Sequence, residues 1–210
     1  MRLHDGEPFF GPGRREPVAT TLEQILAAKS PPTGPFILAI DGRSSNGKST
    51  LAAQIAAARP MTAVVHTDDI AWWHSRFGWD NLLVDGVIIP VRRGQQVDFR
   101  PPAWDERDRP GSVTVPSDAT LVVVEGVGSA RRSLAPHLDA IIWVHTDLDV
   151  TERRDAVRVA AEETDQAGYE GWMAEEVPFQ AAQRTWERAD VIVSGEDAPV
   201  GELVVLHKRL

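Results

Sequence analysis

The chain has 210 residues, 42% of them hydrophobic and 25% charged, and its formal net charge is −9. This composition is typical of one globular domain, and the acidic balance disfavours binding to nucleic acid or an anionic membrane, which needs dense positive charge. The absence of cysteine excludes disulfides, thiolate zinc sites and cysteine nucleophiles. Neither a membrane-spanning apolar run nor a signal-peptide pattern is present. We therefore expect a cytoplasmic protein that acts on a small molecule.

Residues 1–34 are expected to form an N-terminal arm and a short helix. Gly, Pro and charged residues dominate 5–19, which is typical of a loop outside the core. Thr20 and Glu23 have the spacing of a capping box, which predicts that the helix begins there.

Short apolar runs alternate with amphipathic segments from residue 35 to residue 210, and we expect this range to form one domain. The predicted strands are 36–40, 63–66, 121–124, 140–145 and 191–193. The predicted helices are 48–58, about 148–165 and 172–188, the last interrupted by Pro178. Strands this uniformly apolar are covered on both faces, so the pattern predicts a doubly wound, mostly parallel five-stranded sheet with helices on both faces.

Residues 71–117 depart from this alternation. They contain four of the seven tryptophans, namely Trp72, Trp73, Trp79 and Trp104. We interpret the segment as an insertion that covers one side of a site. The alternative is a loop that uses its tryptophans to bury a small core of its own.

The most specific motif is GRSSNGKS at residues 42–49, which fits the phosphate-binding pattern G-x-x-x-x-G-K-[ST] between a predicted strand and a predicted helix. Its backbone N–H groups and the helix N-terminus would face a bound polyphosphate. Lys48 would neutralise the β and γ phosphates, and the Ser49 hydroxyl would bind Mg²⁺. The residues expected to contact the nucleotide are Gly42, Arg43, Ser44, Ser45, Asn46, Gly47, Lys48, Ser49 and Thr50.

Carboxylates follow two of the predicted strands, at the sheet edge where open α/β sheets bind ligands. Asp68 and Asp69 come just after 63–66, and Glu125 comes directly after 121–124. One of them could accept a proton from an acceptor hydroxyl, and another could help to bind Mg²⁺. The alternatives are a helix cap at Asp68–Asp69 and a solvated strand end at Glu125.

A row of arginines lies on the predicted helix after 140–145. Arg154 and Arg158 are four residues apart and share one helical face, with Arg153 beside them. They could close over a nucleotide and stabilise charge on a transferring phosphoryl group. The alternative is a surface helix on which these arginines pair with Glu152, Asp155 and Glu162.

Taken together, these segments resemble the uridine kinase and phosphoribulokinase group of P-loop kinases, from about residue 36 to residue 195. The matching segments are Ile40 to Thr50, His66-Thr67-Asp68-Asp69, Val122 to Gly126, Trp143 to Asp147 with Arg153-Arg154, and Arg188 to Val193. The resemblance implies the P-loop NTPase fold, with ATP and Mg²⁺ as cofactors. It also implies that Asp68 is the catalytic base and a metal-side group, that Glu125 is a metal-side or acceptor-side carboxylate, and that Arg153, Arg154 and Arg158 belong to a lid over about 148–180.

We therefore expect a kinase that phosphorylates a hydroxyl of a small metabolite, with a nucleoside as the favoured acceptor. The residues expected on the acceptor side are Asp69, Trp72, Trp73, Trp79, Arg100, Arg107 and Arg109. The three lysines rule out the guanine-reading Asn-Lys-x-Asp of regulatory GTPases, because they follow Ala28, Gly47 and His207. A kinase for a different acceptor, a nucleotide sensor without phosphoryl transfer and a homo-oligomeric state stay open.

Overall fold

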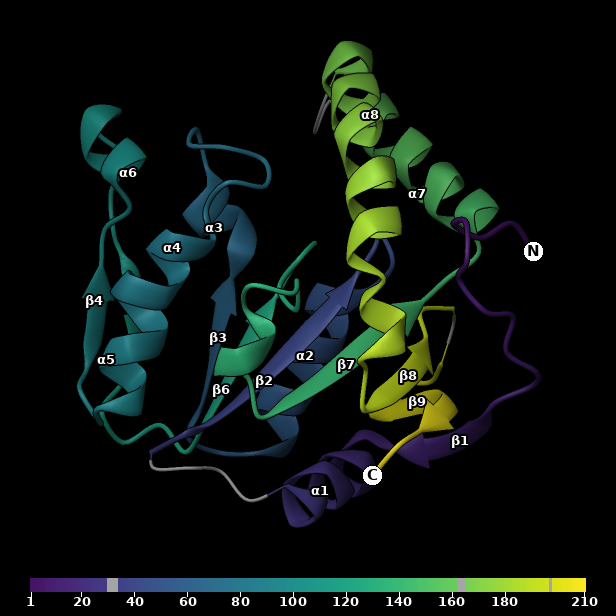
Figure 1. The fold of residues 1–210 in the computed structure, drawn as a ribbon, viewed down its shortest axis with the longest axis horizontal. Coiled ribbons are helices and arrows are strands. Elements are labelled where there is room, and N and C mark those ends of the chain that lie inside the picture. Colours follow the sequence, from purple (N-terminus) through teal and green to yellow (C-terminus); the bar gives the residue numbers. More distant parts are fainter. Residues whose placement is uncertain (30–33, 162–164, 197) are drawn as a thin grey trace.

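The computed structural model describes residues 1–29, 34–161, 165–196 and 198–210. Its centre is a seven-stranded sheet with the strand order β1-β9-β8-β7-β2-β6-β3 (Figure 1). The strands are β1 (Arg14–Pro17), β2 (Phe36–Gly42), β3 (Thr62–His66), β6 (Leu121–Glu125), β7 (Ala140–His145), β8 (Val191–Ser194) and β9 (Glu202–Lys208). The five strands from β8 to β3 are mutually parallel, and these are the five strands predicted.

The prediction of five strands in all is wrong, because two antiparallel strands extend the sheet beyond β8. β9 pairs with β8, and β1 pairs with β9 through the register Arg14–Val205 to Pro17–Glu202. The expectation that 5–19 is a loop outside the core is therefore wrong for β1. It is also wrong for Glu7 and Glu16, whose side chains are buried. β1 contains no apolar residue before its final Pro17, so its sequence lacks the alternation that identifies a half-buried strand.

The long helices among the described residues are α1 (Val18–Ala28) and α2 (Lys48–Ala58), which pack on one face of the parallel strands, and α7 (Leu148–Ala160) and α8 (Gln166–Gln183), which contact each other and extend beyond the carboxyl edge of the sheet (Figure 1). α2 has the predicted bounds, whereas α1 begins earlier than the capping box implies and has no side-chain cap. Asp147 caps α7 by accepting a hydrogen bond from the backbone N–H of Asp149 at 2.9 Å. α8 runs through Pro178 without ending, contrary to the predicted interruption. Residues 162–164, where the first lid helix was predicted to continue, lie outside the described residues.

The segment after β3 folds beside the edge of the sheet (Figure 1). It contains α3 (Thr67–Ala71), α4 (Asp80–Leu83), a π-helical turn (Val84–Ile88), α5 (Ile89–Arg92), β4 (Val97–Phe99), α6 (Pro102–Glu106) and β5 (Val113–Val115). Trp79 and Trp104 pack in one apolar cluster with Ile37 and Val122 of the central sheet. These two tryptophans therefore build a core, as the alternative interpretation of the insertion predicts.

The central strand β2 lies between β6 and β7 and is buried along its whole length. Leu38 and Ile40 pack with α1 and α2 on one face, while Ile37 and Ala39 face the clusters on the other. Because β2, β3 and β6 are parallel, their carboxyl ends meet at one edge, and this brings the phosphate-binding motif, Asp68 and Glu125 together. Among the described helices, none has the length and apolar character of a membrane span.

Candidate active site

The phosphate-binding motif forms a closed loop between β2 and α2. Gly47 turns the chain into α2 with a φ of 96°, in the region that glycine adopts without steric cost. The buried Lys48 curls into the loop, and its Nζ donates to the carbonyl of Arg43 at 2.5 Å and to Asn46 Oδ1 at 3.2 Å. Asn46 Nδ2 in turn donates to the carbonyl of Val144 on β7 at 2.7 Å. The loop is therefore held in shape by its own polar contacts.

A cavity of about 980 Å³ opens in front of this loop. We call it the larger cavity, and its volume lies at the upper end of the range of small-molecule and cofactor sites. Its walls come from the phosphate loop and α2, the first turn of α3, the end of β6, one face each of α7 and α8, and the segment between β8 and β9. Two of the predicted lid residues, Arg154 and Arg158, line it, whereas Arg153 is exposed on α7 and is not among its lining residues.

The carboxylate of Glu125 lies on the floor of the larger cavity. It is 4% exposed, and its Oε1 accepts hydrogen bonds from Ser49 Oγ at 3.0 Å and from His66 Nδ1 at 2.5 Å. Burial alone would raise the pKa of Glu125, but the hydrogen bond from His66 and the charge of Lys48 hold that pKa below its usual value. Glu125 is therefore ionised at neutral pH, and it is not the solvated strand end of the alternative interpretation.

The carboxylate of Asp68 stands beside Glu125, in the first turn of α3. The surrounding protein removes water from this carboxyl and thereby raises the pKa of Asp68. Lys48 opposes the rise, while Glu125 and Asp69 add to it. An aspartate with a raised pKa is a stronger base than an ordinary one.

The oxygen donors next to Lys48 fit a magnesium ion that takes only some of its ligands from the protein. Ser49 and Glu125 supply one hydroxyl and one ionised carboxylate, and no group of three His, Asp or Glu side chains among the described residues forms a metal site by itself. Mg²⁺ in phosphoryl-transfer sites is commonly bound by one or two protein oxygens, substrate phosphates and water. The residues present therefore fit an ion that binds together with a nucleotide.

A smaller cavity of about 440 Å³ adjoins the larger one. It is lined by Asp68, Ala71, Trp72, Trp73, His74, Ser75, Arg76 and Trp172. Asp68, Arg76 and Trp172 line both cavities. The two cavities therefore meet at a point where one carboxylate and one guanidinium are present.

The predicted acceptor-side residues divide between the smaller cavity and its surroundings. Trp72 and Trp73 line the smaller cavity, but Trp79 is 1% exposed in the apolar core, so the prediction that it stacks on a ligand is wrong. Arg109 lies over the rings of Trp72 and Trp104 and donates to Asp69 at 2.5 Å. Asp69 and Arg109 are not among the lining residues. Arg109, held by Asp69, instead packs against the tryptophan wall, by which we mean Trp72 and Trp73.

Two further predicted arginines lie near this wall. Arg107 stacks on Trp73 at 3.9 Å from the ring centroid. Arg100 donates to Asp105 at 2.6 Å and to the carbonyls of Arg109 and Gly111. Its side chain is therefore engaged within the insertion and not at either cavity.

The prediction that the side chain of Arg43 contacts the nucleotide is wrong. Its backbone belongs to the phosphate loop, but its side chain is 2% exposed and turns away from the larger cavity to Glu7 and the carbonyl of Thr146. It therefore does not contact a nucleotide through its guanidinium. Gly42, also predicted to contact the nucleotide, is not among the lining residues of that cavity, whereas the predicted residues from Ser44 to Thr50 all are.

Sequence reasoning missed a polar stripe on α8. Glu176 is buried and accepts from the backbone N–H of Ser44 at 2.9 Å and from its hydroxyl at 2.6 Å. Trp172 donates to the same hydroxyl at 2.6 Å, and Gln180 Nε2 donates to the carbonyl of Gly42 at 3.4 Å. The three side chains are spaced four residues apart, so they share one helical face. This spacing of four residues was the signal in the sequence that could have identified the three side chains as one polar face of the helix.

The chain matches no protein-family model and no curated protein sequence. Solved structures do resemble it. A protein described as a candidate fructose transport system kinase, from Silicibacter sp. TM1040, superposes with a TM-score of 0.62 at 17% identity, over 83% of this chain and 96% of that one.

Two more structures show the same likeness. A protein described as a possible uridine kinase, from Bacillus stearothermophilus, has a TM-score of 0.50 at 20% identity, over 83% of this chain and 96% of that one. The YGR205w protein has a TM-score of 0.55 at 9% identity, over 85% and 93%. The chain therefore has the fold of these proteins, in agreement with the predicted mostly parallel α/β sheet with helices.

Proposed function

We propose that this protein is a kinase that transfers the γ-phosphoryl group of ATP, with Mg²⁺, to a hydroxyl group of a small metabolite. The observation that carries the proposal is the position of Asp68. This carboxylate lines both the larger cavity, which contains the phosphate loop, and the smaller cavity, which has tryptophan walls. A base at such a junction can reach an acceptor in one cavity and a phosphoryl group in the other.

The larger cavity is proposed to hold the nucleotide. Lys48 would leave its contacts with the loop carbonyl and Asn46 to bind the phosphates, and backbone N–H groups of the loop would bind the remaining oxygens. Ser49 and Glu125 would hold Mg²⁺, which neutralises charge on the phosphates when bound. Arg154 and Arg158 on α7 would close the site as part of a lid over 148–180.

The reaction we propose is a direct displacement. The acceptor hydroxyl oxygen forms a bond to the γ-phosphorus while the bond from that phosphorus to the β–γ bridging oxygen breaks, and ADP leaves. Asp68 takes the hydroxyl proton as the new bond forms. Arg76, at the same junction, would leave its ion pair with Glu175 at 2.5 Å to balance negative charge on the transferring group.

The smaller cavity is proposed to hold the acceptor. Trp72, Trp73 and Trp172 offer flat apolar faces that suit a nucleobase or the C–H face of a sugar. The similar structures are described as a possible uridine kinase and as a candidate fructose transport system kinase, and these descriptions mention one nucleoside and one sugar. We therefore propose a nucleoside or sugar-bearing acceptor, with the segment 71–117 as its binding insertion.

The test is a screen of nucleosides and sugars for acceptor-dependent release of ADP. Asp68→Asn should lower kcat on any acceptor found by about 10³-fold, within the range for loss of a general base, while the Kd for magnesium ATP changes little. Asp98→Asn is the matched control, because Asp98 is exposed on β4 and lies in neither cavity.

Full turnover by Asp68→Asn on an acceptor that the wild type phosphorylates would refute the role of Asp68. Tight binding of magnesium ATP without turnover on any acceptor would favour the alternative of a nucleotide sensor.

A further inference from the structure

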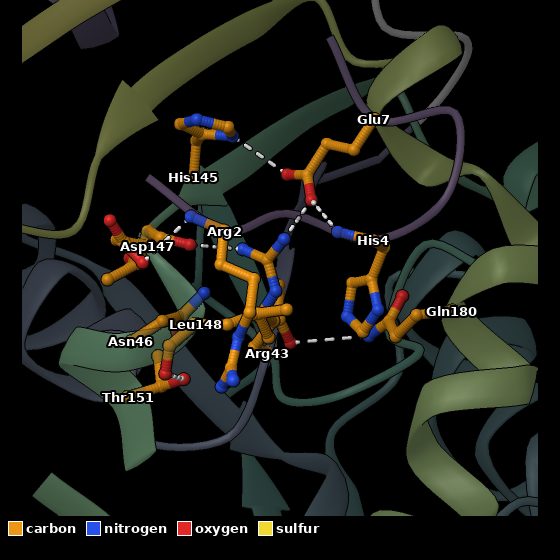
Figure 2. Close-up of polar contacts among 12 residues, drawn as sticks. Arg2, His4, Glu7, Arg43, Asn46, His145, Asp147, Leu148, Thr151 and Gln180 are labelled. Atoms are coloured by element: carbon orange, nitrogen blue, oxygen red, sulfur yellow. Dashed lines mark hydrogen bonds and ion pairs between the residues drawn. The ribbon is translucent and has the colours of Figure 1, made fainter. Parts of the chain in front are cut away.

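The N-terminal segment, residues 1–10, packs against the back of the phosphate loop (Figure 2). Its Glu7 side chain is 0% exposed, which is exceptional for a carboxylate. Glu7 accepts hydrogen bonds from Trp143 Nε1 at 3.1 Å and His145 Nδ1 at 2.7 Å, both on β7, and from the guanidinium of Arg43. A buried charge is thus placed directly behind the loop.

Both neighbours of Glu7 have protonation states that suit this arrangement. Burial, with the charge of Arg43, lowers the pKa of His145 to about 4, so its ring is neutral at pH 7. Burial also lowers the pKa of Arg43 to about 10, which leaves its guanidinium charged. The contact between Glu7 and Arg43 is therefore a buried ion pair, and His145 donates one neutral hydrogen bond to it.

Arg43 is the second residue of the phosphate-binding motif, so its two halves face different surroundings. Its carbonyl accepts the Nζ of Lys48 at 2.5 Å, on the side of the larger cavity. Its guanidinium donates to Glu7 and to the carbonyl of Thr146 on the opposite side. Rotation of the peptide between Arg43 and Ser44 would move Lys48 and the Ser44 N–H together, and the side chain of Arg43 opposes such a rotation.

The same segment also fixes the start of α7. The backbone N–H of Arg2 donates to Asp147 Oδ1 at 3.1 Å, and the carbonyl of Arg2 accepts from the backbone N–H of Leu148 at 2.9 Å. Asp147 is the cap of α7, the helix that carries Arg154 and Arg158. Residues 1–10 therefore connect the phosphate loop to the proposed lid.

We infer that Glu7 and Arg43 are positioning residues, which hold the phosphate loop in the geometry that binds a nucleotide. The inference rests on the proposed function for the identity of the ligand. A buried ion pair is weak evidence for a gain in stability, because desolvation offsets the attraction of the charges, but it does restrict geometry. Here the restricted element is the loop peptide next to Lys48.

The test compares Arg43→Lys with Arg92→Lys. A lysine at position 43 keeps the charge but cannot bridge Glu7 and Thr146 with two nitrogens. Arg92 makes a bidentate ion pair with Asp139, in which Nη1 and Nη2 each donate to one carboxylate oxygen at 2.9 Å. Asp139 also accepts from the backbone N–H of Ile37, so this pair lies near the opposite end of β2. Each variant is measured for its Tm, for hydrogen exchange of residues 42–49 without nucleotide, and for its Kd for magnesium ATP.

We expect Arg43→Lys to speed exchange of residues 42–49 and to raise the Kd about tenfold. Arg92→Lys should lower the Tm at least as much as Arg43→Lys does. It should leave hydrogen exchange of residues 42–49 and the Kd for magnesium ATP unchanged. Loop exchange in Arg43→Lys equal to that of the wild type would overturn the inference. This readout needs no nucleotide, so it is distinct from failure of the proposed function, which would appear as absent ATP binding by the wild type.

Should Arg43→Lys fail to fold, the double variant Glu7→Gln with Arg43→Met serves instead, since removal of both charges of a buried pair is often tolerated. If it is folded and shows fast loop exchange, the inference stands. If it is folded and retains a wild-type loop, the pair is merely structural and the inference falls.

Discussion

The larger cavity is walled by the phosphate loop, the end of β6 and residues of the long helices α2, α7 and α8, whereas the smaller cavity is walled by α3, the turns that follow it and one side chain from α8. Lys48, Ser49 and Glu125 in the larger cavity are fixed by hydrogen bonds to backbone or to one another. The tryptophan wall of the smaller cavity is fixed by stacked arginines, with Arg107 on Trp73 and Arg109 on Trp72.

The two cavities therefore differ in whether their geometry depends on a short sequence motif or on tertiary contacts particular to this chain. The phosphate loop and Glu125 in the larger cavity are brought together by a short motif and by the alignment of parallel strands, and we propose that this cavity holds the nucleotide. The smaller cavity depends on contacts between residues far apart in the sequence, and we propose that it holds the acceptor, the more specific of the two ligands.

The largest expected contrast between the cavities is produced by Lys48→Met. Loss of one cation from the phosphates should lower kcat/KM for ATP by about 10²- to 10³-fold, with little effect on acceptor binding measured alone. Lys29→Met is the matched control, because Lys29 pairs with Asp190 at 2.6 Å and lies in neither cavity. Equal losses in both variants would show that the effect is on folding and not on the phosphate site.

The pH dependence of kcat/KM sharpens the assignment of Asp68. The base must be ionised to act, so kcat/KM should fall tenfold per pH unit below its pKa. Desolvation raises this pKa, which moves the acidic limb above the value of about 3.9 for an ordinary aspartate. Glu125 has a lowered pKa and stays ionised over that range. A pH profile with the limb at or below the ordinary value would contradict the environment described for Asp68.

A smaller effect is expected from the tryptophan wall. Trp72→Ala should raise KM for the acceptor about fivefold, in keeping with the energy of one aromatic contact, and leave KM for ATP unchanged. Trp72→Phe retains an apolar face and should recover most of the loss. Steady-state kinetics with each substrate varied in turn would check this prediction. A change in KM for ATP alone would show that Trp72 contributes to ATP binding and not to acceptor binding.

The smallest expected effect concerns acid stability. Burial lowers the pKa of His4 and of His145 to about 4, from 6.5. Between these pH values the unfolded chain binds more protons than the folded one, so stability falls as the pH falls from 6.5 to 4. The Tm should decrease by several degrees over this window, as measured by calorimetry. A Tm that rises over the same window would contradict the burial of these two rings as neutral groups.

Much of the phosphate-binding half of the site could be predicted from the sequence. The motif at 42–49, the five parallel strands and α2 depend on local patterns, and all are found as predicted. The sequence also favours a common location for Asp68 and Glu125, because each follows a predicted strand and parallel strands end at one edge of the sheet.

The remainder depends on tertiary contacts that leave no local signal. The sequence shows Trp72 and Trp79 close together, yet only the fold decides that Trp72 lines a cavity while Trp79 is in the core. Arg43 lies inside a recognised motif, but the direction of its side chain is set by Glu7, which is 36 residues away. β1 reads as a loop because its strand identity comes from pairing with β9 near the other end of the chain.

We propose above that the phosphoryl group passes directly from ATP in the larger cavity to the acceptor in the smaller cavity, with Asp68 as the base. A single-turnover experiment tests it, with ATP labelled at the γ-phosphate, excess enzyme and the acceptor identified by the screen. Direct transfer predicts that the label appears in the acceptor at the rate at which ADP is released, with none on the protein, and that Asp68→Asn slows both processes together. Label found on the protein, or only in inorganic phosphate while the acceptor is present, would contradict it.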